Sequence, residues 1–456
     1  MTLEERNADL ERQLAEQKRE NAALRQELEK LRKEIEEWKR GFRERGKRRS
    51  SRAEAKSGAA PKKPGRKAGH PGATRPMPDE IHGTIEHPAD KVCDCGGSTV
   101  KTGETESVVL QDIPPVSAEN IRHVAPVRQC KRCGKRVVAK LPGSVPGGNS
   151  VAKVQLGPNA LAFALGLRFE QHVPLGGIST ILNTWFGLKI TPGGLSQLFA
   201  RWGARSGATY QEILTRIRSS AVVGADETGL RQNGVSGWAW IIRTDEASLF
   251  RIELSRAEWV IASMLGDSFR GILCSDYYGV YTTHDDWIHA YCSAHTIREA
   301  KKIAELSPCK VTEEFRDRLR ALYRDAEVAQ ASGDLTARRG IRIRMGRLIA
   351  DTVLKAHPEI ARLQARLHKH FHGVLTFLDH PNVPADNNST ERDIRALAVH
   401  RKVTGGTRSP AGSQALGHWM SVSQTLKKND RPLRQFIVEL HQAHYDNRPP
   451  PSVFSH

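Results

Sequence analysis

Two acidic residues stand side by side in AVVGADETGL, residues 221 to 230, directly after an apolar run. The run contains β-branched residues and predicts a buried strand that ends at Asp226 and Glu227. A second apolar run, GILCSD, predicts a neighbouring strand that ends at Asp276, and Glu391 opens a later helix. Carboxylates from distant segments can meet at one end of a sheet, where their mutual repulsion calls for a cation. Oxygen ligands of this kind suit Mg²⁺ or Mn²⁺.

The chemistry that such a cluster predicts is metal-dependent phosphoryl transfer. Two ions about 3.5–4 Å apart can clamp the attacking and leaving oxygens of an in-line displacement, and rigid strand ends suit their ligands. Taken singly, Asp226 is also explained as a turn residue or helix cap, and Glu391, next to Arg392 and Arg395, as a surface ion pair. The joint pattern favours catalysis by Asp226, Asp276 and Glu391. Spacing alone does not exclude other acids, namely Glu227, Asp267, Asp285, Asp286, Asp386 and Asp393.

The elements that must position these acids form a mixed α/β pattern. Strands are predicted at 221–230, 237–244 and 248–255, then a helix at 257–266, a strand at 270–281 and a helix at 296–306. The order β-β-β-α-β-α is that of a ribonuclease H-like core, a mixed sheet with flanking helices. Residues 310 to 372 are helical and basic and interrupt this core. A helix over 386–403, whose acidic and Asn-rich start suits an N-cap, then contributes Glu391.

The charge of the chain is strongly basic and unevenly distributed. The 456 residues carry 70 Lys and Arg against 51 Asp and Glu, and the net charge of +19 favours nucleic acid as a partner over a merely soluble basic protein. Residues 41 to 75 hold 12 Lys or Arg and two acids in a Pro-, Gly- and Ser-rich stretch that cannot fold alone. We predict a basic arm that contacts DNA phosphates, with a solvated linker as the alternative. The candidate DNA-binding residues of this arm are Lys47, Arg48, Arg49, Lys62, Lys63, Arg66 and Lys67.

The first forty residues predict a coiled coil. Apolar residues recur at intervals of seven or fourteen, at Leu3, Leu10, Leu24, Leu31 and Trp38, and no Pro or Gly interrupts them. Asn at the other seam position, at residues 7 and 21, selects a parallel two-stranded pair at some cost in stability. We predict a zipper that supports dimerisation, with a single solvated helix as the alternative.

Cysteine usage indicates a reducing compartment. The seven cysteines form no dense disulfide framework, the N-terminus has no signal-peptide pattern, and no apolar run of about 18 residues predicts a membrane span. Four of them, Cys93, Cys95, Cys130 and Cys133, can hold one structural zinc as thiolates. Cys93-x-Cys95 is one residue shorter than the usual pair, so free surface thiols are the alternative.

Residues 155 to 218 have apolar residues at helical spacing throughout. The stretch from 174 to 203 predicts a helix, a short turn at 186–189 and a second helix, a spacing that suits a helix-turn-helix. Two helices around a turn are also common in ordinary packing, and the pair Gly193–Gly194 is poor for a recognition helix.

These features together resemble the transposases of the insertion-sequence-66 family across nearly the whole chain. ADETGLR is similar to the family's first Asp motif, SDYYGVY to its second and NNSTERDIR to its Glu helix. The resemblance implies that Asp226, Asp276 and Glu391 form a DDE triad that holds two Mg²⁺ or Mn²⁺ ions, with Asp226 bridging both. It implies no nucleotide cofactor.

The resemblance extends to residues around the triad. CSAHTIREAKK is similar to the family's Cys-x-x-His element and includes Cys292 and His295. His295 either supports catalysis or is a structural histidine at a strand-to-helix turn, and we interpret Cys292 as a small buried residue. A basic stretch next to Glu391 would support catalysis or bind DNA phosphates, through Arg392, Arg395, Arg401 and Lys402.

The function implied is that of a DNA transposase which cleaves the 3′ ends of its element and joins them to target DNA. Its partners would be terminal repeats, target DNA, a second copy or more in the end-paired complex, and accessory proteins of the same element; it would act in bacterial cytoplasm, at the nucleoid, with no membrane. Two alternatives remain: a catalytically inactive dimeric repressor, and a ribonuclease H-like nuclease that cuts without joining.

The expected organisation follows from these segments. It comprises a coiled coil at 1–40, a basic arm at 41–80, a zinc-finger-like segment at 81–148, a helical DNA-binding domain at 150–219, a first core part at 220–309, a helical insertion at 310–380, a second core part with the Glu helix at 381–445 and a tail at 446–456.

Overall fold

The computed structural model describes residues 75–138, 154–284 and 286–454. The predicted coiled coil and the seven predicted DNA-binding residues of the basic arm lie outside these ranges, as does Asp285. The chain divides into two units, Met1–Asp112 and Ile113–His456. Among the described residues, no helix is both long and apolar enough to cross a membrane.

The described part of the first unit has no helix or regular strand. Its most ordered feature is a tight turn around Cys93 and Cys95, in which the N–H of Cys93 donates to the carbonyl of Gly97 at 2.8 Å and both thiols are exposed. The other cysteine pair lies in the second unit, between β1 (Val127–Gln129) and β2 (Arg136–Val138). Backbone N–H groups of Cys133 and Arg132 lower the pKa of the Cys130 thiol, which favours the thiolate that zinc requires. A zinc site shared by the two pairs stays a prediction.

Four helices precede the sheet: α2 (Pro158–Phe169), α3 (Leu175–Phe186), α4 (Pro192–Arg205) and α5 (Gly207–Arg218). The helix-turn-helix arrangement expected from the sequence corresponds to α3 and α4. Helix α3 ends at Gly187, whose positive φ of 68° suits glycine, and Thr191 caps α4 by accepting from the N–H of Gly194 at 3.1 Å. Contact of these helices with DNA stays a prediction.

A five-stranded mixed sheet forms the centre of the second unit, so the predicted combination of helices and sheet is confirmed. Its strands are β3 (Val222–Gln232), β4 (Val235–Arg243), β5 (Ser248–Glu253), β6 (Ile272–Ser275) and β7 (Ile288–Tyr291), in the order β5-β4-β3-β6-β7. Strands β3, β4 and β5 are antiparallel neighbours, whereas β6 and β7 run parallel to β3. The parallel half of this sheet carries the acids.

Two strand ends differ from the expectation. Asp226 does not end its strand, because β3 continues to Gln232 and Asp226 pairs with Ile241 of β4. The apolar run stops at Asp226, but the hairpin partner β4 extends the strand beyond it. The strand expected over 270–281 covers only Ile272–Ser275, and the short helix α7 (Gly279–Thr282) occupies its second half.

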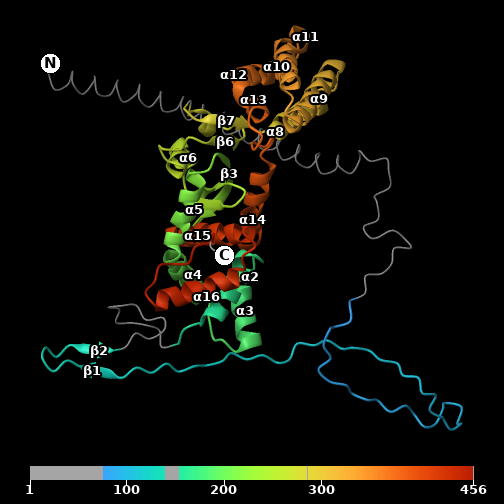
Figure 1. The fold of residues 1–456 in the computed structure, drawn as a ribbon, viewed down its shortest axis with the longest axis vertical. Coiled ribbons are helices and arrows are strands. Elements are labelled where there is room, and N and C mark those ends of the chain that lie inside the picture. Colours follow the sequence, from blue (N-terminus) through green and yellow to red (C-terminus); the bar gives the residue numbers. More distant parts are fainter. Residues whose placement is uncertain (1–74, 139–153, 285, 455–456) are drawn as a thin grey trace, which may run out of the picture. The chain divides into compact units, whose positions relative to one another are not determined.

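Helices cover the sheet and bring in the later acids. They are α6 (Glu258–Leu265), α8 (Ser293–Leu306), α14 (Asn388–Thr404), α15 (Pro410–Lys428) and α16 (Leu433–Tyr445). Helix α15 lies along β5 and against α4, and α16 packs on α2 (Figure 1). One hydrophobic core therefore joins α2 to α5, the antiparallel half of the sheet, and the C-terminal helices.

A second core forms where the sequence predicted a helical insertion. Its helices are α9 (Lys310–Ser332), α10 (Leu335–Ala350), α11 (Thr352–Lys355), α12 (Pro358–Lys369) and α13 (Phe371–Val374), followed by the 3₁₀ turn η1 (Thr376–Leu378). They lie together at the β6–β7 end of the unit, away from α2 to α5 (Figure 1). Their buried side chains, such as Phe315 and Met345, share a cluster with Ile272 of β6 and Ala290 of β7.

His400 of α14 packs against helix α2 and should make the stability of the fold sensitive to acid. Its ring stacks on Phe169 of α2, with centroids 5.9 Å apart. Burial, and then the charges of Arg168 and His172, lower the pKa of His400 to about 3. In the unfolded chain the pKa of His400 is about 6.5. Between about pH 6.5 and about pH 3 the unfolded chain therefore binds a proton at this residue that the folded protein does not bind. Within that range the free energy of unfolding falls by about 1.4 kcal/mol for each unit by which the pH is lowered.

We therefore expect the free energy of unfolding of the wild type to decrease, relative to that of His400→Leu, as the pH is lowered from neutrality. Urea unfolding of both proteins over the same pH series measures this difference. A difference that does not change with pH would contradict the assignment.

Candidate active site

Strand register brings Asp226 and Asp276 to the same level of the sheet. Strands β3 and β6 are parallel and pair Val222 with Ile272 through Gly224 with Cys274. Each aspartate lies two residues beyond that last pair, Asp226 within β3 and Asp276 directly after the parallel strand β6. The register therefore sets the two acids level with each other beyond the parallel pairing, with Asp226 inside its own strand; their catalytic role stays a prediction.

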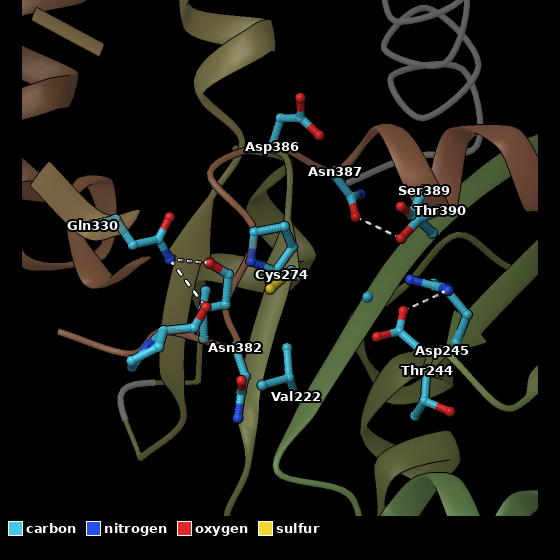
Figure 2. Close-up of a pocket in the computed structure, with 15 residues that line it drawn as sticks. Val222, Thr244, Asp245, Cys274, Gln330, Asn382, Asp386, Asn387, Ser389 and Thr390 are labelled. Carbon is cyan, nitrogen blue, oxygen red and sulfur yellow. Dashed lines mark hydrogen bonds and ion pairs between the residues drawn. The ribbon is translucent and has the colours of Figure 1, made fainter. Parts of the chain in front are cut away.

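The third acid, Glu391, comes from the first turn of α14. The start of this helix is tied to β3 by Asn387, whose amide donates to the carbonyl of Ala225 at 2.9 Å. The Asn387 carbonyl oxygen accepts from the hydroxyl of Thr390 at 2.5 Å, and Figure 2 shows these two side chains turned toward each other. Both are almost fully buried, so the tie is shielded from water.

The close approach of α14 to β3 depends on Gly224. A Cβ at this position would overlap the Thr390 hydroxyl and would lie 3.2 Å from Arg243 Cδ and 3.3 Å from Asn387 Oδ1. A larger residue fits only if the helix moves or these side chains rearrange. Gly224 and Asn387 were missed by the sequence reasoning, and a glycine two residues before a strand carboxylate was the available signal.

The three carboxylates interact electrostatically. Burial, and then the negative charges of Glu227, Asp276 and Glu391, raise the pKa of Asp226 to about 7, against a lowering by the Glu227 N–H. That N–H donates to Asp226 Oδ1 at 2.8 Å. Among the described residues, no cation pairs with Asp226, so its charged form is poorly compensated. An all-oxygen donor set suits a hard divalent cation, but in this structure the ligand atoms of the three acids do not all lie within 4.8 Å of one another.

Glu391 is held by a cation of the protein. Its Oε1 accepts from Arg298 Nη2 of α8 at 2.6 Å and lies 3.7 Å from His295 Nε2. His295 and Glu391, together with Cys292, place one possible ligand atom each within 4.8 Å of one another. Cys292 is buried, as expected from the sequence, and burial raises the pKa of its thiol.

Two of the competing acids have ion-pair partners in the fold. Glu227 points to the opposite face of β3 from Asp226, where its side chain is only 4% exposed and pairs with Arg256 at 2.6 Å and with the Tyr281 hydroxyl. Asp393 contacts Arg243 at 3.2 Å and Lys428 at 2.6 Å. Those contacts fix the carboxylates in the fold.

The remaining competing acids lie apart from the cluster or at its edge. Asp386 accepts from the N–H of Asn388 at 2.9 Å and so helps to begin α14. Asp267 and Asp286 are exposed on loops. A nearby cavity of about 250 Å³ is lined by Asp386, Asn387 and Thr390 but by none of the three predicted catalytic acids (Figure 2).

The basic residues after Glu391 fall into two groups. Arg392, Arg395 and Lys402 are exposed on α14 and remain candidates for DNA phosphates. Arg401 is half-buried, and its guanidinium donates to Thr228 Oγ1 at 3.2 Å and to the Gly229 carbonyl. Arg401 therefore fastens α14 to β3, a structural contact that the sequence did not predict.

Comparison with known proteins identifies the family. The model of the Transposase IS66 family matches residues 153–415, which include the three acids. Three proteins of Sinorhizobium fredii (strain NBRC 101917 / NGR234), each named only as uncharacterized, are similar to the chain. Protein y4jD is 25% identical over 358 residues (70% of this chain and 68% of y4jD), and y4hP is 23% identical over 415 residues (80% and 73%).

Protein y4jO is 26% identical over 167 residues, which are 36% of this chain and 50% of y4jO. The chain therefore matches half of the length of that relative. The family model, by contrast, covers more than half of this chain, from just before α2 into the first turns of α15. The resemblance seen in the sequence is thus confirmed, and the chain belongs to the IS66 family of transposases.

Proposed function

We propose that this protein is a DNA transposase that cleaves the 3′ ends of its own insertion sequence and joins them to target DNA by a DDE mechanism. The observation that carries the proposal is that strand register sets Asp226 level with Asp276, and that the charges of Asp276 and Glu391 both act on Asp226. Family membership supports a DNA-processing enzyme, and the net charge of +19 supports a polyanionic substrate.

The strand order supports a ribonuclease H-like core. Counting along the chain from β3, the order β5-β4-β3-β6-β7 places the first strand in the centre, with an antiparallel meander on one side and parallel strands on the other. This arrangement matches the β-β-β-α-β-α order of the sequence expectation. The helices α9 to α13 would then be an insertion between the second acid and the third.

The chain's own residues would act by holding and orienting the reacting groups. Asp226, Asp276 and Glu391 would hold Mg²⁺ or Mn²⁺, and exposed Arg392, Arg395 and Lys402 would bind the DNA backbone. The bound cation supplies charge neutralisation and Lewis-acid activation at the reacting oxygens. In the first step water attacks a phosphodiester and releases a 3′-OH; in the second that hydroxyl attacks a target phosphodiester. Each step breaks one P–O bond and forms one, with no covalent protein intermediate.

Other parts of the chain would supply binding and assembly. The zipper at 1–40 would pair two copies, since two transposon ends must be held together, and the basic arm at 41–80 would add phosphate contacts. A four-thiolate zinc at 81–148 and DNA contacts by the helices of 150–219 belong to the same proposal, as do accessory proteins of the element.

The test uses the full-length purified chain and a labelled duplex taken from the flanks of its own gene. With Mg²⁺ or Mn²⁺ we expect 3′-end nicking followed by joining to a second duplex, and neither product in EDTA or with an unrelated duplex. Cutting without joining would favour the nuclease alternative. Tight binding to the end with no product in either metal would favour the repressor alternative.

A further inference from the structure

A group of three metal-ligating side chains lies beside the triad and has a different chemistry. Cys292, His295 and Glu391 each offer one ligand atom, and these atoms lie within 4.8 Å of one another; this is the one such group found among the described residues. The triad offers oxygen alone, as hard cations prefer. Sulfur, nitrogen and oxygen together are instead the donor set of zinc and similar thiophilic cations.

The local fold pre-arranges two of these ligands. Cys292 is the residue before α8, and His295 lies in the first turn of that helix. The N–H of Asn387 donates to Cys292 Sγ at 3.1 Å. A hydrogen bond from a backbone N–H to sulfur holds a metal-bound thiolate in its orientation. The same Asn387 starts α14, so it also fixes where Glu391 lies relative to the sulfur.

The distances are close to those of a tetrahedral site. Zinc binds nitrogen and oxygen at about 2.0–2.2 Å and sulfur at about 2.3 Å, so neighbouring ligand atoms are separated by roughly 3.3–3.8 Å. His295 Nε2 and Glu391 Oε1 are already 3.7 Å apart. The three ligand atoms lie within 4.8 Å of one another, so their separations must shorten by only about 1 Å to match a zinc site.

Arg298 forms an ion pair with Glu391, the carboxylate that such a cation would bind. Its Nη2 lies 2.6 Å from Glu391 Oε1, and its side chain is 53% exposed. The guanidinium can therefore swing into solvent without leaving a buried charge behind. A cation at this position would replace the attraction that Arg298 supplies to Glu391.

We propose that Cys292, His295 and Glu391 bind a thiophilic divalent cation of the zinc class, with water as the fourth ligand. Binding takes Glu391 away from the cluster with Asp226 and Asp276. The site is therefore inhibitory and competes with Mg²⁺, a consequence that rests on the proposed function, whereas the binding itself does not.

The binding test uses Co²⁺ as a spectroscopic probe of the full-length protein. A Co²⁺–thiolate bond gives a charge-transfer absorption band, and metal analysis gives the number of ions bound per chain. Other thiols, including the four of the predicted zinc-finger-like segment, also bind Co²⁺, so the measurement is a difference between variants. The variants are Cys292→Ser and His295→Gln, and the matched control is Cys309→Ser.

Cys309 is the appropriate control because it too is the residue before a helix, α9, and its thiol contacts Thr312. We expect Cys292→Ser and His295→Gln each to bind one Co²⁺ fewer than the wild type, and Cys309→Ser to bind the same number. The His295 side chain is partly exposed, so we expect His295→Gln to fold. Circular dichroism checks the folding of all three variants. Equal Co²⁺ content in the wild type and both site variants, or an equal loss in Cys309→Ser, overturns the proposal.

The inhibition test titrates Zn²⁺ into the cleavage reaction at fixed Mg²⁺ and expresses each variant relative to its own zinc-free activity. We expect Cys292→Ser to need at least about tenfold more Zn²⁺ for half-inhibition than the wild type or Cys309→Ser. Equal zinc sensitivity overturns the inhibitory role. If Mg²⁺ supports no cleavage by the wild type, the proposed function fails, and the Co²⁺ measurement still decides the metal site.

Discussion

Replacement of Asp226 by Asn is expected to reduce Mg²⁺-dependent cleavage and joining by about 10³-fold or more, while the protein still binds the transposon end. Asn keeps the size of the side chain and its acceptor for the Glu227 N–H, but it removes the negative charge that a divalent cation requires. Gel assays of nicking and joining, together with binding by anisotropy, separate the two effects. Cleavage within a few-fold of the wild type would remove Asp226 from the triad.

The adjacent acid provides the matched control. Glu227→Gln changes one carboxylate to an amide on the same strand, but on the opposite face, where the side chain pairs with Arg256 and Tyr281. We expect this variant to lose about 1–3 kcal/mol of stability, because charged hydrogen bonds are weakened, and to retain cleavage. Equal loss of activity in both variants would mean that the strand as a whole, rather than Asp226, is needed.

Asp226→Asn should also stabilise the metal-free protein at high pH. The folded pKa of about 7 lies above the ordinary aspartate pKa of 3.8, so the native state holds the proton more tightly than the unfolded chain. Stability is therefore lost as the pH rises from about 4 to about 7, by roughly 1.4 kcal/mol per unit, and Asn avoids that loss. In EDTA the variant should be more stable than the wild type at about pH 8, and Mg²⁺ should narrow the gap by stabilising the wild type alone.

The sequence located the strands and the helix that carry the predicted acids better than the contacts that connect these elements. Apolar runs ending in carboxylates located β3 and β6, and the helix pattern located α14. The strand end at Asp226 was wrong because local hydrophobicity does not register the hairpin partner β4, which extends β3. Arg298 was not singled out, because its pairing with Glu391 joins residues 93 positions apart.

The contacts that position Glu391 were beyond single-sequence reasoning for a related reason. The acidic and Asn-rich start of α14 was expected to cap the helix, and Asp386 does accept from the N–H of Asn388. Asn387 instead reaches 162 positions back along the chain to the carbonyl of Ala225. Nothing in the local pattern distinguishes a capping Asn from one that fastens a helix to a strand, since both are polar residues at a helix start.

Because α14 is held close to β3 at Gly224, Gly224→Ala is the second substitution with a large expected effect. The added Cβ would overlap the Thr390 hydroxyl, so α14 must shift or the side chains around it must rearrange. Overpacking of this kind costs about 1–3 kcal/mol, and a displacement of Glu391 by about 1 Å would lower cleavage by about 10²-fold. Urea unfolding and the nicking assay measure the two losses on the same preparation.

A double-mutant cycle assigns the effect to the contact with α14. Thr390→Ala removes the overlapping hydroxyl, so Gly224→Ala should cost less in that background than in the wild type, with a coupling of about 0.5–3 kcal/mol. Gly229→Ala is the control on the same strand, because its Cβ would meet only Arg401 Nη1 at an ordinary 3.7 Å. If both glycine substitutions are equally harmful, or the cycle shows no coupling, then strand β3 itself resists alanine and the approach of α14 is not what Gly224 permits. If the coupling appears in stability and in cleavage alike, the position of Glu391 depends on the same contact that holds the helix to the sheet.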